Sequence, residues 1–158
     1  MSFHTPTGTR GARFPLPAPV VRLVNRFTAR RVRSTGGRAL MGGMDVLVLT
    51  TVGAKSGEER STPLAWFPGG DGTWLVVASA AGQVRNPAWF HNLAAHPDRV
   101  RIELDGQRID VTAEQLHDDE RARAWADLTA AGPQFGKYAE ATDRELPVVR
   151  LRRRPDAA

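Results

Sequence analysis

The chain has 158 residues, 41% of them hydrophobic, which is enough for one hydrophobic core and too few for two ordinary domains. It contains no cysteine, so disulfides, thiolate metal sites and cysteine nucleophiles are excluded, as expected in a reducing compartment. There is no apolar run of about 18 residues and no signal-peptide pattern, so we expect a cytoplasmic protein without a transmembrane helix.

The net charge of +5 comes from the N-terminal part of the chain. Residues 1–44 carry eight arginines and no aspartate or glutamate, whereas the remaining 14 basic residues are outnumbered by 17 acidic ones. Basic segments of this kind bind nucleic acid, anionic membrane surfaces or acidic ligands. The sign of the charge restricts the partner without choosing among these three.

The N-terminal region divides into an arm and a helix. Residues 1–18 mix Pro, Gly and Arg without periodicity, which predicts a flexible arm in front of a single domain at 19–158. From about Val20 to Val32 the apolar residues recur with helical spacing, and arginines occupy another face. The apolar face of this amphipathic helix consists of Val20, Leu23, Val24 and Phe27. We expect this face to pack against the rest of the protein, because its side chains need burial.

The rest of the chain has the pattern of hairpins with helices inserted between them. Strands are expected at 46–52, 62–67, 73–79, 99–104, 107–113 and 146–152, and helices at 87–95 and 118–131. GGDG at 69–72 and Asp105-Gly106 indicate hairpin turns, and Asn86 is expected to cap the helix that Pro87 begins. Strands and helices do not alternate, which disfavours a doubly wound sheet. We predict a mainly β fold with added helices (α+β), a small closed or split β-barrel of about six mostly antiparallel strands.

The first informative loop is TTVGAKSGEERSTPL at 50–64, between two predicted strands. Its glycines can adopt positive φ angles, and unpaired amides in such a turn form a concave nest of donors. Lys55, Ser56 and Arg60 add two cations and a hydroxyl, a combination that suits phosphate or carboxylate groups. The alternative is a solvated turn whose charges serve solubility. The loop does not match the GxxxxGK pattern of nucleotide triphosphatases.

The second informative stretch, SAAGQVRNPAWFHNLAAHP at 79–97, begins with small residues and enters a helix. Small side chains let a planar ligand approach the backbone, and a helix N-terminus adds positive partial charge. The alternative is that Trp89, Phe90 and Leu93 anchor a surface helix in the core. The chain has no GxGxxG, GxSxG or HExxH pattern, so we expect no dinucleotide fold, serine hydrolase or metal site.

These two stretches and a third occur in a characteristic order. They are LTTVGAKSGEERSTPL at 49–64, ASAAGQVRNPAWFHNLAAHP at 78–97 and YAEATDRELPVV at 138–149. Together they resemble the deazaflavin-dependent nitroreductase family, whose members use coenzyme F-420, over about Leu23 to Leu151. The resemblance implies a split β-barrel similar to the FMN-binding fold. It places the coenzyme's phosphate at the first loop and its ring near the start of the second stretch.

The resemblance also implies roles for individual residues. The implied coenzyme-binding residues are Lys55, Ser56, Gly57, Arg60, Pro63, Leu64, Ser79, Ala80, Ala81, Gly82, Arg85, Trp89 and Asn92. The implied catalytic residues are Tyr138, as proton donor or substrate contact, and Ser79. The implied walls of the substrate pocket are Phe135, Tyr138 and Trp89. Ala54 stands where the family usually has a basic residue, which removes one cation from the phosphate site.

The implied function is an F-420-dependent oxidoreductase of the nitroreductase family. It would transfer a hydride between the reduced coenzyme and a small organic acceptor such as a quinone, a nitroaromatic or an activated double bond. The N-terminal helix would attract the coenzyme's oligoglutamate tail or make a peripheral membrane contact.

Three alternatives remain open at the level of sequence. They are a split barrel that uses FMN, a coenzyme carrier without turnover, and a basic module that binds nucleic acid or a membrane. We expect no nucleic acid, because the aromatic residues do not interleave with the arginines. The sequence leaves the oligomeric state open.

Overall fold

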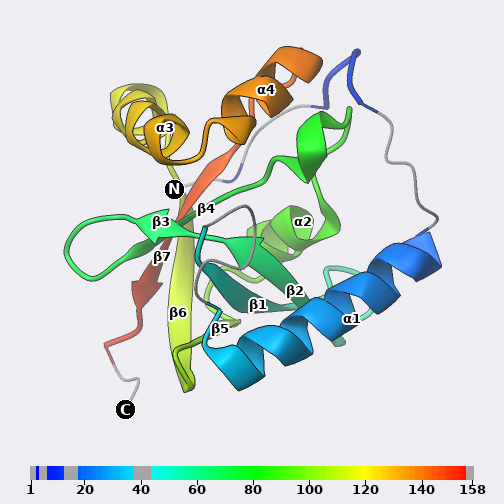
Figure 1. Ribbon diagram of the computed structural model, residues 1–158, viewed down its shortest axis with the longest axis vertical. Helices are drawn as coiled ribbons and strands as arrows, with labels where there is room; N and C mark the ends of the chain where they lie inside the picture. The colour runs from blue at the N-terminus through cyan, green and yellow to red at the C-terminus, as the bar shows by residue number, and fades with distance from the viewer. Residues whose placement is uncertain (1–2, 4–6, 13–17, 38–43, 156–158) are drawn as a thin grey trace.

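The computed structural model describes residues 3, 7–12, 18–37 and 44–155, which form one curled sheet with helices around it (Figure 1). The helices are α1 (Ala18–Thr35), the short 3-10 helix η1 (Ala80–Gly82), α2 (Ala88–Ala95), α3 (Asp118–Ala131) and α4 (Gln134–Ala141). The strands are β1 (Val46–Val52), β2 (Glu59–Ala65), β3 (Phe67–Pro68), β4 (Trp74–Val77), β5 (Val100–Leu104), β6 (Gln107–Gln115) and β7 (Val148–Arg153).

The strand order in the sheet is β2-β1-β5-β6-β7-β4-β3, and every neighbouring pair is antiparallel. Only Trp66 separates β2 from β3 along the chain, although these strands stand at opposite ends of that order. The sheet must therefore curl until its two edges approach each other, which is the predicted split β-barrel of the α+β class. The described residues form seven strands and not about six, because the strand expected at 62–67 divides at Trp66.

The predicted hairpins are present. β1 pairs with β2 around the first loop, the GGDG turn joins β3 to β4, and β5 pairs with β6. Asp105 and Gly106 have φ angles of 49° and 74°, the two positive values that a tight type I′ turn requires. These local turns set the register of the strands that carry the site.

One hydrophobic cluster fills the inside of the curled sheet, and a second lies on the opposite face of β4 and β7, under α3 and α4. Trp89, Phe90 and Leu93 of α2 belong to the first, together with residues of β1, β4, β5, β6 and β7. Leu128 of α3 and Phe135 of α4 belong to the second, which packs on β3, β4 and β7. The helix within the second informative stretch is thus a core element.

The N-terminal helix α1 packs on β1 and β2 with a different face from the expected one. Ala29 and Val32 are only 3% and 1% exposed and cluster with β1, and Arg33 Nε lies 2.5 Å from Glu103 Oε2. The expected contact face is exposed, at 39% for Val20, 51% for Leu23, 48% for Val24 and 62% for Phe27. At about 100° per residue, this face lies nearly opposite Ala29 and Val32. The prediction that it packs against the rest of the protein is therefore wrong, and smaller side chains make the contact with the sheet instead.

Two other local features differ from the sequence pattern. Asn86 does not cap α2, which has Pro87 at its N-cap position and no side-chain capping bond. Asn86 Oδ1 accepts a hydrogen bond from Arg144 instead. Helix α4 has no counterpart among the predicted elements, and it contains Gly136, a residue that disfavours helix formation.

The described part of the expected N-terminal arm is attached to the fold. The Gly8 amide donates to the Val84 carbonyl at 3.0 Å, and the Ala12 amide donates to the Gly82 carbonyl at 2.9 Å. At residues 7–12 the chain is therefore hydrogen-bonded to a distant loop, whose acceptors no local pattern could reveal. The residues of the expected arm that lie outside the described part are 1–2, 4–6 and 13–17.

Candidate functional site

The lysine loop, as residues 53–60 are called below, consists of the connection between β1 and β2 and the first two residues of β2. The Gly53 amide donates to the Glu58 carbonyl at 2.8 Å, and the Gly57 amide donates to the Gly53 carbonyl at 3.0 Å. Gly57 has a φ of 72°, a conformation that glycine adopts without strain. Ser56 Oγ accepts from the Glu58 amide at 3.2 Å, so its hydroxyl proton stays available to a ligand. The loop is an exposed hairpin turn, as its sequence predicts.

Two cations extend from this hairpin into solvent. Lys55 is exposed and makes no ion pair with the described residues. Arg60 Nη2 lies 3.1 Å from Glu58 Oε2, and both side chains are more than half exposed. An exposed pair of this kind contributes about 0–1 kcal/mol, so an anionic ligand can displace it at little cost. Both cations are therefore available to a phosphate or carboxylate.

Asn92 of α2 ties the lysine loop to the core. Its Oδ1 accepts from the Ala54 amide at 3.0 Å, and its Nδ2 donates to Thr51 Oγ1 at 3.1 Å. Asn92 is 8% exposed, so these bonds form in a nearly dry environment where losing them is costly. Asn92 was predicted from the sequence to contact the coenzyme. In the structure its side chain also holds the lysine loop against α2.

The small-residue turn, residues 79–82, has an unusual backbone. Ser79 is in the right-handed helical region, whereas Ala80 and Ala81 have φ angles of 45° and 53°. A right-handed residue followed by a left-handed one turns successive amides toward one point and forms an anion-binding nest. Within the described part of the chain, the amides of Ala80 and Ala81 have no acceptor. Left-handed alanines cost about 1–2 kcal/mol each, so this turn is strained and must be held by its surroundings.

Arg144 donates hydrogen bonds at both ends of this turn, and it is not among the site residues predicted from the sequence. Its guanidinium donates to the carbonyls of Ala78 (3.0 Å), Ser79 (2.8 Å) and Gln83 (3.1 Å) and to Asn86 Oδ1 (2.5 Å). The side chain is 4% exposed, and burial lowers the pKa of Arg144 from its ordinary value. The sequence feature that could have indicated Arg144 is its position in the third quoted stretch, as a charged residue shortly before an apolar strand.

Helix α4 brings the backbone of Tyr138 next to the small-residue turn, and Phe135 of the same helix contacts the Tyr138 ring. A Cβ added at Gly82 would lie 2.7 Å from the Tyr138 carbonyl oxygen, so the turn and the helix backbone are in close contact. The rings of Phe135 and Tyr138 meet edge to face, with centroids 5.7 Å apart. Trp89, the third expected wall, is 6% exposed in the other core cluster. The structure therefore groups Phe135 with Tyr138 and places Trp89 apart from them.

The remaining predicted coenzyme residues lie on different surfaces. Leu64 packs against the core cluster that contains Asn92's helix, whereas Pro63 pairs with Val48 on the face that α1 covers. Neighbouring residues of a strand point to opposite faces, so only Leu64 lies on the inner side of the sheet. Arg85 is exposed and, like Lys55, has no ion pair with the described residues.

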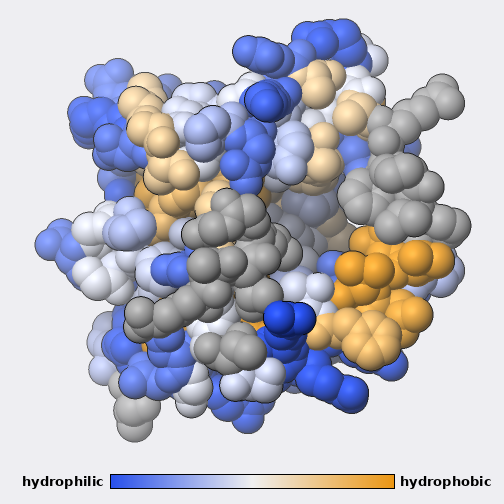
Figure 2. Space-filling model, viewed as in Figure 1, coloured by the Kyte–Doolittle hydropathy of each residue, from blue (hydrophilic) through white to orange (hydrophobic). Residues whose placement is uncertain are grey.

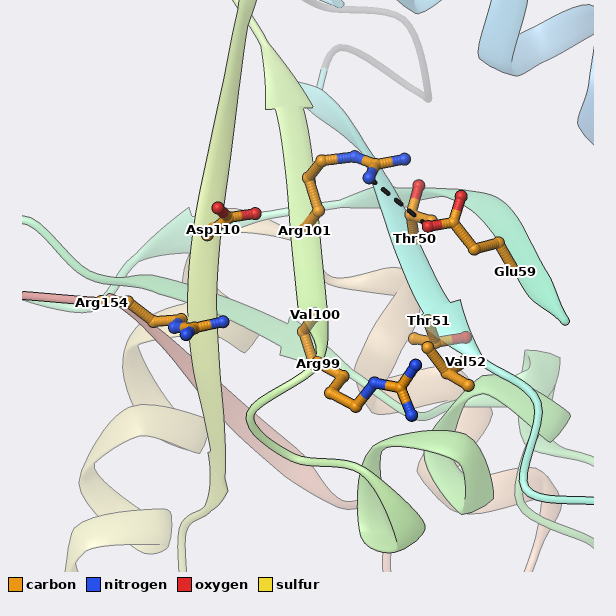
Figure 3. Close-up of a pocket in the computed structure, with 9 residues that line it drawn as sticks. All are labelled: Thr50, Thr51, Val52, Glu59, Arg99, Val100, Arg101, Asp110 and Arg154. Atoms are coloured by element: carbon orange, nitrogen blue, oxygen red, sulfur yellow. Dashed lines mark ion pairs between the residues drawn. The ribbon is translucent and has the colours of Figure 1, made fainter. Parts of the chain in front are cut away.

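Two surface hollows lie away from these residues. One, of about 250 Å³, is on the outer face of β1, β5 and β6, where Arg99, Arg101 and Arg154 meet Glu59 and Asp110 (Figure 3). Its charges largely compensate each other, and one arginine pairs with a glutamate at 3.5 Å. The other, of about 550 Å³, lies between α3 and the β3–β4 turn. Neither hollow is lined by a residue that the sequence analysis assigned to the coenzyme.

The curled antiparallel sheet, the hairpin loop with its exposed cations and the strained turn together define a split-barrel protein whose donor groups suit an anionic ligand. A family model described as F420H(2)-dependent quinone reductase matches residues 21–153. The chain belongs to this family. The finding confirms the resemblance drawn from the three sequence stretches and the coenzyme that it implied. The family description specifies quinones, and reduction of nitro groups stays a prediction.

Relatives and solved structures agree with this assignment. The F420H(2)-dependent quinone reductase Rv1261c of Mycobacterium tuberculosis (strain ATCC 25618 / H37Rv) is 40% identical over 128 residues, covering 77% of this chain and 85% of that protein. A structure titled as an F420-H2 dependent reductase (FDR-A) has a TM-score of 0.60 at 34% identity, over 67% of this chain and 92% of the other. A second, titled as a domain-swapped dimer, has a TM-score of 0.62 at 31% identity, over 85% and 99%.

Proposed function

We propose that this protein is a coenzyme F-420-dependent quinone reductase. The observation that carries the proposal is the link through Asn92, because it joins the exposed cations of the lysine loop to the helix that follows the small-residue turn. Amides without an acceptor among the described residues, together with Lys55 and the exposed Arg60–Glu58 pair, fit a ligand with a phosphate and a polar planar ring. When bound, the coenzyme supplies the hydride, and the protein supplies binding, orientation and a dry surface.

Each loop has its own part in binding. Lys55, Arg60 and the Ser56 hydroxyl would hold the phosphate and the first carboxylates of the tail through charge-assisted hydrogen bonds. The amides of the small-residue turn would receive the polar edge of the ring, with Leu64 beneath it and Arg85 at the rim. Alanines at positions 80 and 81 leave the backbone accessible there. Trp89 would support the ring from within the core.

Phe135 and Tyr138 would form the quinone side of the site. A quinone that accepts a hydride also needs one proton to become the hydroquinone, and a neutral phenol can donate that proton. Tyr138 is half-buried on α4, whose backbone contacts the small-residue turn, and this contact supports the assignment of its hydroxyl to the quinone side. A Tyr138→Phe protein with full turnover would exclude it as the proton donor.

The first experiment is a titration of the purified protein with oxidised coenzyme F-420 and, separately, with FMN, followed by tryptophan fluorescence. Micromolar affinity for the deazaflavin and none for FMN is the expected result, followed by turnover with a quinone. A Trp89→Phe protein is the control that identifies which of the four tryptophans reports binding. Equal or tighter binding of FMN would replace the proposed cofactor, and no binding of either would reject the site.

The exposed face of α1 supports a second part of the proposal, which is contact with an anionic lipid surface. Figure 2 shows an apolar patch over one end of this helix with strongly hydrophilic residues beside it. The patch consists of Val20, Leu23, Val24 and Phe27. Arg22, Arg26 and Arg30 flank it, are exposed, and make no ion pair with the described residues. An amphipathic helix with these two faces lies in the plane of a membrane interface, where lipid-soluble quinones are found.

Vesicle flotation tests this contact. Vesicles with 30% or so anionic lipid should carry the protein at low salt, and neutral vesicles should not, because each cation near the surface contributes about 1 kcal/mol. Leu23→Gln with Phe27→Gln should abolish flotation and leave coenzyme affinity unchanged. No flotation of the unchanged protein would remove the membrane part and leave the proposed reaction standing. None of the described helices is long and apolar enough to cross a membrane.

A further inference from the structure

Arg144 donates most of its hydrogen bonds to the backbone on the two sides of the small-residue turn. Three of its four hydrogen bonds go to main-chain carbonyls, and these belong to residues on both sides of the small-residue turn. The two terminal nitrogens bind Ala78 and Ser79 at its start, and Nε binds Gln83 just after its end. The planar guanidinium therefore holds the two ends of the turn at a fixed separation.

The turn needs such a clamp because its backbone is unfavourable by itself. Ala80, Ala81 and Gly82 have three successive positive φ angles, and only the last is a glycine. Chains relax from such conformations unless contacts outside the turn define them. The carbonyls bound by Arg144 are those contacts, and the amides of Ala80 and Ala81 have no acceptor among the described residues.

The charge of Arg144 is also uncompensated. No carboxylate pairs with it among the described residues, and its neighbour Asp143 instead accepts hydrogen bonds from the Thr9 and Arg10 amides at 2.8 and 2.9 Å. Buried charges usually have an ionic partner, because burial without one is costly. The Arg144 amide donates to Thr142 Oγ1 at 3.1 Å, which fixes the backbone from which the guanidinium extends.

We propose that Arg144 is a positioning residue that both clamps the small-residue turn and places a positive charge behind its free amides, so that the site binds reduced coenzyme more tightly than oxidised coenzyme. The inference rests on the proposed function. A cation close to the ring favours the redox form with more electron density, which is the reduced one. The clamp by itself favours neither form, since it acts on the shape of the turn.

Two variants and a matched control separate the clamp from the charge. Arg144→Met removes both, and Arg144→Lys keeps the charge but loses the planar fork. Arg121→Met is the control, because Arg121 is also largely buried and donates to a main-chain carbonyl, that of Leu146 at 2.8 Å. Arg121 lies on α3, and none of its bonds involves the small-residue turn.

Amide hydrogen exchange of the protein without coenzyme tests the clamp. The reporters are the amides of Gly82 and Gln83, which donate to carbonyls within the turn at 2.8 and 3.1 Å. Exchange at these amides should become at least tenfold faster in Arg144→Met and in Arg144→Lys, and should be unchanged in Arg121→Met. Unchanged exchange in both Arg144 variants would overturn the clamp, and Arg144→Lys decides the matter if Arg144→Met does not fold.

Anaerobic titration with both redox forms of coenzyme F-420 tests the charge. Arg144→Met should weaken binding of both forms and that of the reduced form about tenfold more, equivalent to about 30 mV in the potential of the bound two-electron couple. Arg144→Lys should weaken both forms equally, because its charge remains. An equal loss of both forms in Arg144→Met would overturn the role of the charge. If the unchanged protein binds neither form, the proposed function fails, whereas the exchange result still decides the clamp.

Discussion

The lysine loop and the small-residue turn offer donors to a ligand in opposite ways. The lysine loop is exposed, carries its donors on side chains, and is held by its own backbone and by Asn92. The small-residue turn is partly buried, offers backbone amides, and depends on a buried arginine and on α4. Removing a donor side chain of the lysine loop should therefore alter affinity without altering stability, whereas changes in the small-residue turn should alter both. Four predictions test this division, from the largest effect to the smallest.

The largest effect is expected from adding one methyl group at Gly82. Its φ is 79°, and the new Cβ would lie 2.7 Å from the Tyr138 carbonyl and 3.0 Å from the Ala141 Cβ. Strain and overpacking together should cost about 3 kcal/mol of unfolding free energy, measured by urea denaturation.

Gly57→Ala is the matched control in the lysine loop. Gly57 has a similar φ of 72°, but nothing lies within 4 Å of an added Cβ. We expect a cost of about 1 kcal/mol there, from backbone strain alone. Equal losses in the two variants would contradict the difference between the two regions.

Removing the link between the regions should have the next largest effect. Asn92→Leu leaves the Ala54 amide and the Thr51 hydroxyl without their partner, which should cost about 2 kcal/mol of unfolding free energy and weaken coenzyme binding. Thr51→Val breaks only the second of these bonds, so it should reduce stability less and leave affinity nearly unchanged. Equal loss of affinity in both variants would show that Asn92 does not act through the Ala54 amide.

The cations of the lysine loop should affect affinity only. Lys55→Ala and Arg60→Ala should each weaken coenzyme binding about tenfold, since each removes one charge-assisted contact that is partly screened by water. Their melting temperatures should stay within error of the unchanged protein. Arg108→Ala, another exposed arginine, is the control. Affinity that is unchanged in both loop variants would contradict the phosphate assignment.

The smallest effect concerns the segment at residues 7–12 that lies behind the small-residue turn. Hydrogen bonds from the Thr9 hydroxyl and from the Arg10 and Thr9 amides lower the pKa of Asp143 from 3.8 to about 2. Because the folded pKa is below the unfolded one, the contact is fully present above about pH 4 and is lost as the pH falls through about 2. NMR shifts of the Thr9 and Arg10 amides should follow this transition.

Asp143→Asn is the control for that titration. Its side chain cannot ionise, so the acid transition of the two amide shifts should disappear, and the segment should be less firmly held at neutral pH. The same transition in the variant would assign it to another carboxyl group.

Local sequence patterns were sufficient to predict those turns and strands that depend on residues adjacent in the chain. The hairpin at Asp105–Gly106 and the strand at Val46–Val52 follow from turn chemistry and from apolar β-branched runs, both of which are local. The lysine loop could be proposed as an anion site for the same reason, since its glycines, cations and hydroxyl lie close together in the sequence. The three stretches together also identified the family.

The side chains that hold the candidate site together can be identified only in the folded structure. Asn92 reaches the lysine loop across 38 residues, and Arg144 reaches Ser79 across 65, so no local pattern predicts either bond. The orientation of α1 was decided in the same way, because the shape of the β1 surface admits Ala29 and Val32 and leaves the more apolar face outside. Burial and hydrogen bonding depend on what the fold brings into contact, and those neighbours are distant in sequence.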